Sequence, residues 1–240
     1  MTSDLIEIID GLSIDDVDQW VSGLSTRKQE EARFHDRLRD MAARKEIAGT
    51  PDFQQQFGNS KFLGTDVFCD NERYFDETAL SRNIGYLSDK HFHNTIQRSV
   101  KNKTVLDMAC GFGREGILAG LWGASLVVGI DVSAKSIEEA KRLAKRKGVQ
   151  DRTRFLVADC ESTGLPSEGF DVIICARMLH HVDFEATLIE ASRLMRPGGR
   201  VISIEALGHN PVINWYRNHT PSPENRVGDE THPHPRESQS

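Results

Sequence analysis

The fold of this 240-residue chain is decided by the stretch Val105-Leu106-Asp107-Met108-Ala109-Cys110-Gly111-Phe112-Gly113. Its first half is a short apolar run, which is typical of a buried strand, and its second half is a glycine-rich loop that leads into a helical pattern. Glycines in such a loop let the backbone approach a ligand at the amino terminus of the helix. The stretch therefore predicts a strand, a ligand-binding loop and a helix, in that order.

Further apolar, β-branched runs follow this stretch and alternate with helical patterns. Strands that are apolar on both faces and alternate with helices predict a parallel sheet that is covered on both sides. Right-handed crossovers make it a doubly wound, Rossmann-like α/β domain whose ligand binds at the carboxyl ends of the strands. The expected strands are 104–108, 126–130, 155–157, 172–175 and 201–204, and the clearest helices between them are 133–147 and 184–195.

Composition excludes several classes of protein. The chain is 38% hydrophobic and 28% charged, and it has no run near the roughly 18 apolar residues that a membrane span requires. A net charge of −6 argues against a nucleic-acid partner. The four cysteines are scattered without a CxxC pair, so we expect buried thiols in a cytoplasmic protein, and neither disulfides nor a metal site. They are Cys69, Cys110, Cys160 and Cys175.

The glycine loop fits two families of cofactor. The run 111–116 reads GFGREG, and Asp131 follows Gly111 by 20 residues, as in the dinucleotide-binding fingerprint. This fit keeps an NAD-dependent dehydrogenase as a remote alternative. Asp107 argues against it, because an acid inside the first strand is unfavourable beside a pyrophosphate and suits a cationic ligand better.

The whole stretch 105–113 resembles the first motif of class I S-adenosyl-L-methionine-dependent methyltransferases, whose cofactor carries a sulfonium and an amine but no phosphate. Four later stretches resemble the family's following motifs in the correct order. They are 128–133, 157–160, 169–174 running into Leu179-His180-His181-Val182, and 194–200. The resemblance implies S-adenosylmethionine as cofactor and methyl transfer as the activity.

The resemblance also implies roles for individual residues. Asp131 is expected to accept hydrogen bonds from the ribose hydroxyls, and Asp159 from the amino group of adenine. Asp107 has two roles open to it, anchoring backbone amides of the glycine loop or acting electrostatically near the cofactor. Ala109 stands where the family usually has glycine. The cofactor-binding residues expected are Asp107, Ala109, Cys110, Gly111, Phe112, Gly113, Asp131, Val132, Asp159, Cys160 and Arg177.

The acceptor is expected to be a small molecule, with O-methylation favoured. The stretch 176–179 lacks the Asn/Asp-Pro-Pro-aromatic tetrapeptide of amino-methylating enzymes, and Cys175 lies within a strand rather than in a catalytic cysteine pair. A base is needed only if the acceptor loses a proton, and an imidazole that titrates near neutrality suits that role. The candidates are His180 and His181 after the fourth strand and His35 on the amino-terminal helix.

Three regions are expected along the chain. Residues 1–101 form a helical, aromatic-rich lid on the acceptor side, residues 102–217 the α/β domain, and residues 218–240 a disordered tail rich in proline and histidine. The family's sixth and seventh strands are not recognisable, which would leave the fifth strand as an open edge that a homodimer could cover. For the same reason, a cofactor-binding protein that is catalytically impaired or regulatory is the main alternative function.

Overall fold

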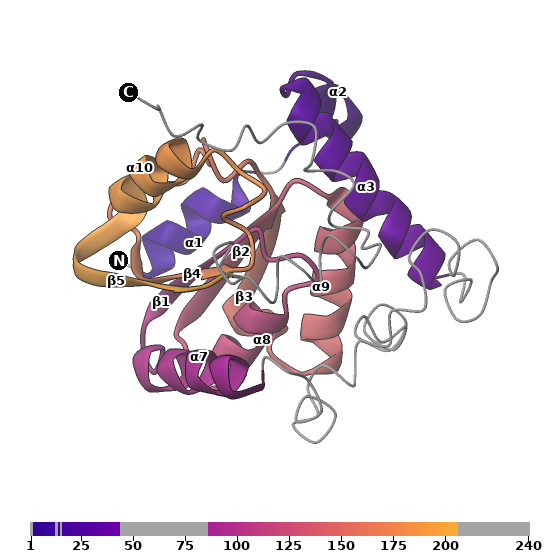
Figure 1. The fold of residues 1–240 in the computed structure, drawn as a ribbon. Coiled ribbons are helices and arrows are strands. Elements are labelled where there is room, and N and C mark those ends of the chain that lie inside the picture. Colours follow the sequence, from indigo (N-terminus) through magenta and orange to yellow (C-terminus); the bar gives the residue numbers. More distant parts are fainter. Residues whose placement is uncertain (1, 13, 15, 44–85, 206–240) are drawn as a thin grey trace, which may run out of the picture.

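A computed structural model describes residues 2–12, 14, 16–43 and 86–205 of the chain (Figure 1). The predicted tail, Cys69 and most of the aromatic residues of the expected lid lie outside these ranges. No helix in the ranges described is both long enough and apolar enough to cross a membrane.

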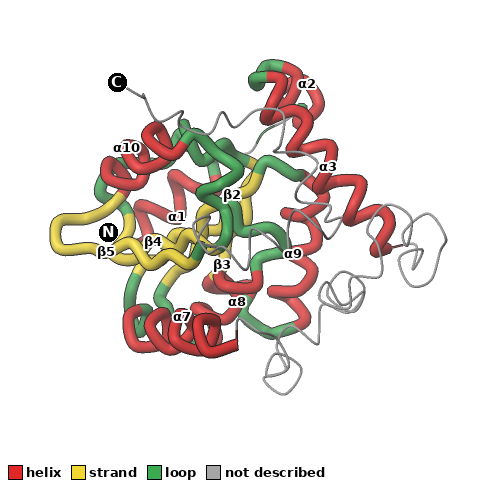
Figure 2. The backbone as a smooth tube through the Cα atoms, in the orientation of Figure 1, coloured by secondary structure: helices red, strands yellow, loops and turns green. Residues whose placement is uncertain are grey.

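A five-stranded parallel sheet forms the centre of the molecule, as predicted (Figure 2). The strands are β1 (Thr104–Met108), β2 (Leu126–Asp131), β3 (Thr153–Val157), β4 (Phe170–Ala176) and β5 (Met195–Ile204), in the order β3-β2-β1-β4-β5. β1 pairs with β2 on one side and with β4 on the other, so the direction of winding reverses beside β1. Ligands of open α/β sheets bind at such a switch point.

Helices cover both faces of the sheet, because alternate residues of each strand point to opposite faces. On one face, Leu106 and Met108 pack in a cluster with residues of α1 (Thr2–Asp10) and α10 (Phe184–Leu194). On the other face, Val105 and Val127 pack against α7 (Tyr86–Ser99). α8 (Arg114–Leu121) and α9 (Ala134–Arg146) complete this second layer, and a short 3₁₀ helix (Gln150–Arg152) precedes β3.

Two further helices lie outside these layers. α2 (Val17–Ser22) begins after its N-cap Asp16, and α3 (Thr26–Ala43) runs beside α9 near the carboxyl ends of the strands (Figure 1). The predicted lid region thus contributes α1 and α7 to the layers on the sheet, whereas α3 lies over the position expected for the ligand. The boundary predicted at residue 101 remains a prediction.

β5 lies at the edge of the sheet in the described part of the chain. The expected absence of a sixth and a seventh strand concerns residues 206–240, which lie outside the described ranges. Both that absence and the homodimer across this edge therefore remain predictions.

Candidate functional site

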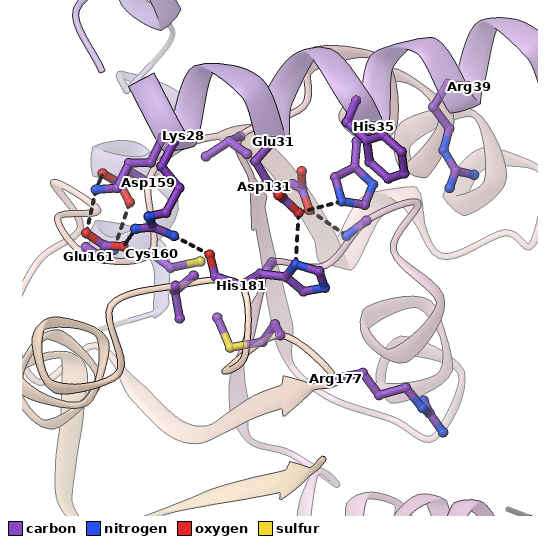
Figure 3. Close-up of a pocket in the computed structure, with 17 residues that line it drawn as sticks. Lys28, Glu31, His35, Arg39, Asp131, Asp159, Cys160, Glu161, Arg177 and His181 are labelled. Carbon is purple, nitrogen blue, oxygen red and sulfur yellow. Dashed lines mark hydrogen bonds and ion pairs between the residues drawn. The ribbon is translucent and has the colours of Figure 1, made fainter. Parts of the chain in front are cut away.

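A cavity of about 210 Å³ lies at the switch point, between α3 and the carboxyl ends of the strands (Figure 3). The structure brings most of the predicted site residues to its wall. They are His35, Ala109, Gly111, Asp131, Val132, Asp159, Cys160, Arg177 and His181. The other five predicted residues, Asp107, Cys110, Phe112, Gly113 and His180, are not among the residues that line it.

The glycine loop turns sharply between β1 and α8. Gly111 has φ +52°, and no atom lies within 4 Å of the position that a Cβ would take, so its backbone is open to a ligand. Gly113 has φ +79°, and a Cβ there would lie 2.7 Å from Cε1 of Phe155. Gly111 therefore provides the close approach that a cofactor needs, whereas Gly113 permits close packing of the loop on β3.

Ala109 has a backbone conformation that favours glycine. Its φ is +49°, in the left-handed region, where a Cβ approaches the following carbonyl oxygen. The sequence comparison with the family identified this position as a departure, and the structure shows the physical consequence.

Asp131 closes the loop from the end of β2. Its Oδ2 accepts a hydrogen bond from the Gly111 amide at 2.9 Å, and its Oδ1 accepts one from the Ser133 amide at 2.8 Å. A carboxylate oxygen can accept two hydrogen bonds, so both oxygens keep capacity for a further donor. This arrangement fits the ribose diol expected for a nucleoside cofactor.

Asp107 lies beneath the loop and is 1% exposed. Its Oδ2 accepts a hydrogen bond from the Gly116 amide at 2.8 Å, in the first turn of α8. Burial, together with the nearby charge of Glu115, raises the pKa of Asp107 well above its usual value. Of the two roles expected for Asp107, the geometry shows the anchoring one.

Asp159 is engaged by a lysine that the sequence did not point to. Its Oδ1 accepts a hydrogen bond from the Glu161 amide at 3.0 Å, and its Oδ2 contacts the ammonium group of Lys28, on α3. Lys28 also pairs with Glu161 at 2.6 Å. Burial alone would lower the pKa of Lys28, but the two carboxylates outweigh it and raise that pKa. α3 thus covers the carboxylate expected to bind adenine.

The three candidate histidines have different surroundings. His180 is 44% exposed, and its Nδ1 lies 2.8 Å from one carboxylate oxygen of Glu205. The other oxygen of Glu205 accepts hydrogen bonds from the backbone amides of Met178 and Leu179. His181 lines the cavity, and its Nδ1 lies 3.2 Å from Glu31 of α3. His35 lies 3.0 Å from the same carboxylate through its Nε2.

Burial determines the charge of His181. It lowers the pKa of the ring to about 4, assisted by the neighbouring His180 and His35 and opposed by Glu31. The ring is therefore neutral at pH 7, and it is a weaker base than the imidazole titrating near neutrality that the sequence led us to expect. Burial would also lower the pKa of His35, but its hydrogen bond to Glu31 and the charge of Asp131 raise that pKa instead.

Two arginines also line the cavity (Figure 3). Arg177 has φ +56° and pairs with Asp89 of α7. Arg39 of α3 places its guanidinium group 5.0 Å from the centre of the Phe112 ring, a cation–π distance. Phe112 therefore helps to hold α3 rather than lining the cavity.

A parallel sheet with this strand order, a glycine loop at its switch point and a carboxylate at the end of β2 defines a Rossmann-like cofactor-binding domain. The family model described as a methyltransferase domain matches residues 105–199. Residues 105–199 belong to the class I S-adenosylmethionine-dependent methyltransferase family. This membership decides between the two families that the glycine fingerprint allowed.

Three curated relatives match the chain in part. It is 36% identical to the 27-O-demethylrifamycin SV methyltransferase of Amycolatopsis mediterranei over 98 residues. This stretch covers 40% of this chain and 36% of the relative. It is 33% identical over 129 residues to the ubiquinone biosynthesis O-methyltransferase of Psychrobacter arcticus, 53% of this chain and 49% of the relative. It is 27% identical to the sterol 24-C-methyltransferase of Pneumocystis carinii, over 60% of this chain and 36% of the relative. The chain thus covers less than half of each relative's length.

Proposed function

We propose that this protein transfers the methyl group of S-adenosylmethionine to a hydroxyl group of a small-molecule acceptor. The observation that carries the proposal is that a neutral histidine, His181, lines the same cavity as Gly111 and Asp131. A group that can take a proton thus lies beside the groups suited to hold the cofactor. The names of two relatives, an O-methyltransferase of ubiquinone biosynthesis and a methyltransferase acting on 27-O-demethylrifamycin SV, support a hydroxyl acceptor.

The bound cofactor would supply a methyl group on a positively charged sulfur, which leaves as a neutral thioether. The protein's own residues bind the cofactor and orient it. The Gly111 backbone would lie against the cofactor, and Asp131 would accept hydrogen bonds from the ribose hydroxyls. Asp159 would accept one from the adenine amino group once Lys28 has moved away. Because the leaving group is neutral, positioning supplies much of the catalysis, and the protein needs no strong acid.

The cavity wall bears on the nature of the acceptor. Phe34, Met178 and Val182 provide apolar surface around His181. These apolar groups share the wall with charged residues, among them Arg39 and Arg177. Apolar surface beside a proton acceptor suits a phenol or an enol. The name of the sterol 24-C-methyltransferase relative indicates methylation of a carbon atom. Our proposal that the acceptor atom is oxygen therefore rests on His181.

Calorimetry with S-adenosylmethionine, S-adenosylhomocysteine and NAD tests the cofactor. We expect the first two to bind and NAD not to bind. Asp131→Ala is expected to weaken S-adenosylmethionine binding by about 1 to 3 kcal/mol, the scale of a hydrogen bond to a charged group. Glu138→Ala, at an exposed position of α9, is the control and should leave the affinity unchanged. An unchanged affinity in Asp131→Ala would show that Asp131 does not bind the ribose.

A second candidate function is a protein that binds the cofactor without turnover. The contact between Lys28 and Asp159 favours it, because that contact covers part of the expected site. Assays with methyl-labelled cofactor and a set of phenols and enols separate the two candidates. Binding without label transfer to any of them would favour the regulatory protein.

A further inference from the structure

We propose that Glu31 is a positioning residue: its carboxylate fixes His181 in the tautomer and orientation in which the ring can take a proton from the acceptor. This inference rests on the proposed function, since it assigns the group that prepares the base of that same site. Glu31 lies in an amino-terminal helix, outside the family motifs, and nothing in its local sequence marks it.

Glu31 lies between two histidines. One of its oxygens is 3.0 Å from Nε2 of His35 and 3.2 Å from Nδ1 of His181. Its side chain is 14% exposed, and the two rings meet edge to face with their centres 6.5 Å apart. The carboxylate therefore bridges α3, which carries Glu31 and His35, and the segment after β4, which carries His181 (Figure 3).

The chemistry of the carboxylate fixes the tautomer of His181. An ionised carboxylate can only accept hydrogen bonds, so its position 3.2 Å from Nδ1 favours the tautomer of a neutral His181 in which Nδ1 carries the proton. The lone pair is then on Nε2. In Figure 3 the second ring nitrogen of His181 points away from Glu31, and the residue lines the cavity. The nitrogen able to take a proton thus belongs to the side of the ring that Glu31 leaves open.

The charges around Glu31 favour a neutral His181. One carboxylate can balance one positive charge, and His35 is the histidine whose pKa is raised, whereas burial lowers the pKa of His181 to about 4. The other groups that face His181 are Arg27, which donates to its backbone carbonyl, and His180, with its ring centre 4.0 Å away and backed by Glu205. Arg27, His180 and Glu205 are unchanged in variants of Glu31 alone.

The proton step follows from this arrangement. As the acceptor oxygen forms its bond to the methyl carbon, its O–H proton passes to Nε2 of His181. The carbon–sulfur bond breaks with its electron pair remaining on sulfur, so the sulfonium becomes a neutral thioether. His181 ends as an imidazolium whose Nδ1–H still faces Glu31, and the carboxylate stabilises that charge.

The test uses two variants of the full chain. Glu31→Leu removes the hydrogen-bond acceptor, whereas Glu31→Gln keeps an amide oxygen that can accept from Nδ1–H but removes the charge. Glu30→Gln is the matched control, because Glu30 is exposed on the same helix. Thermal unfolding of each variant shows whether it is folded.

The first readout needs neither cofactor nor turnover. Nitrogen-15 NMR of the histidine side chains of the ligand-free protein, assigned with a His181→Gln variant, reports which nitrogen carries the proton. We expect the Nδ1–H tautomer in the wild type and in Glu30→Gln, its retention in Glu31→Gln, and its loss in Glu31→Leu. An identical His181 tautomer in the wild type and in Glu31→Leu would overturn the inference.

The second readout is kinetic. We expect kcat to fall by about 10- to 100-fold in Glu31→Leu, less than the roughly 100- to 10,000-fold that a general base itself contributes, with partial recovery in Glu31→Gln. KM for the cofactor should change little, and the acid limb of the kcat profile should shift only in the Glu31 variants. A wild type that binds cofactor but transfers no label would count against the proposed function, whereas an active Glu31→Leu with an unchanged pH profile would overturn the role of Glu31 alone.

Discussion

The ammonium group of Lys28 contacts the carboxylate of Asp159, although 131 residues separate the two in the sequence. The contact joins α3 to the segment that follows β3. It also occupies a carboxylate that we assign to the adenine amino group, so α3 and the cofactor compete for the same oxygen.

Removing the lysine should therefore improve cofactor binding. We expect Lys28→Met to tighten S-adenosylmethionine binding by at least about fivefold, the equivalent of about 1 kcal/mol, because the competing ion pair is largely buried, with side chains 16% and 11% exposed. Calorimetry at low and at high salt measures this, and high salt should reduce the difference between variant and wild type.

Lys135→Met is the matched control for this prediction. Lys135 also pairs with α3, through Asp40, but it does not line the cavity. Its loss weakens the docking of α3 without freeing Asp159, so the affinity gain should be confined to Lys28→Met. Weaker binding in Lys28→Met would mean that the lysine contacts the cofactor rather than competing with it.

Asp107→Asn tests the anchoring role of the buried strand acid. A carboxyl group whose pKa is raised on folding makes the fold less stable at a pH above its usual pKa of 3.8, because the ionised form is disfavoured in the folded chain. Asparagine keeps an oxygen for the Gly116 amide and removes the proton linkage. We therefore expect Asp107→Asn to be at least as stable as the wild type at pH 7, with an unchanged cofactor affinity.

Urea unfolding at several pH values and calorimetry check this prediction. Asp107→Ala is the contrasting variant, because it leaves the Gly116 amide unsatisfied at a cost of about 1 to 3 kcal/mol. Should Asp107→Asn bind the cofactor much more weakly than the wild type, the acid would have the electrostatic role after all.

Ala109→Gly should stabilise the protein. Ala109 has φ +49°, and glycine adopts this conformation without a steric penalty, so we expect a gain of up to about 1 kcal/mol, reduced by the greater entropy of glycine in the unfolded chain. Asn102→Gly is a comparison at φ +58°, where asparagine is tolerated better, and the gain should be smaller. The urea midpoints of the two variants and of the wild type measure these gains. A loss of stability in Ala109→Gly would show that the packing of the methyl group outweighs the backbone strain.

Glu190 links the free energy of unfolding to acid pH. It accepts hydrogen bonds from the amide and hydroxyl of Thr163 and from Arg193, and these contacts, with Arg193 the largest contributor, lower its pKa to about 2. A lowered carboxyl pKa stabilises the fold above its usual value near 4.5, and this stability is lost as the pH falls toward about 2.

Glu190→Gln should therefore destabilise the protein by about 1.5 to 3 kcal/mol at pH 7, the range for hydrogen bonds to a charged group. The difference from the wild type should shrink as the pH falls below the usual carboxyl range. Glu185→Gln, at an exposed position of the same helix, should change stability little. Equal differences at neutral and at acid pH would contradict the linkage.

The sheet was predictable because each strand carries its own local signal. The runs at 104–108 and 126–130 are apolar and β-branched, and their alternation with helices determines the parallel order. The placement of Gly111 and Asp131 beside each other was predictable for a similar reason. The spacing between a glycine loop and the end of the next strand is a property of a single βαβ unit.

The contacts of α3 were not predictable in this way. Its sequence is mostly charged, which is typical of a solvated helix, and a helical period does not tell which charge meets which partner. The pairings of Lys28 with Asp159 and of Glu31 with His181 depend on how α3 lies over the sheet, which is a tertiary property. The choice between His180 and His181 was likewise open, because only the fold shows that His181 lines the cavity whereas the neighbouring His180 contacts Glu205.

The packing of α1 also bears on the order in which the chain can fold. Leu5 and Ile9 share a core cluster with Leu165, Ala191 and Leu194, so part of the surface on which α1 packs lies more than about 150 residues later in the sequence. Contacts of such long sequence separation form late, because the intervening loop must first be ordered. Until that later segment is in place, the apolar face of α1 lacks some of its native partners, and a chaperone or a transient non-native contact can meet it.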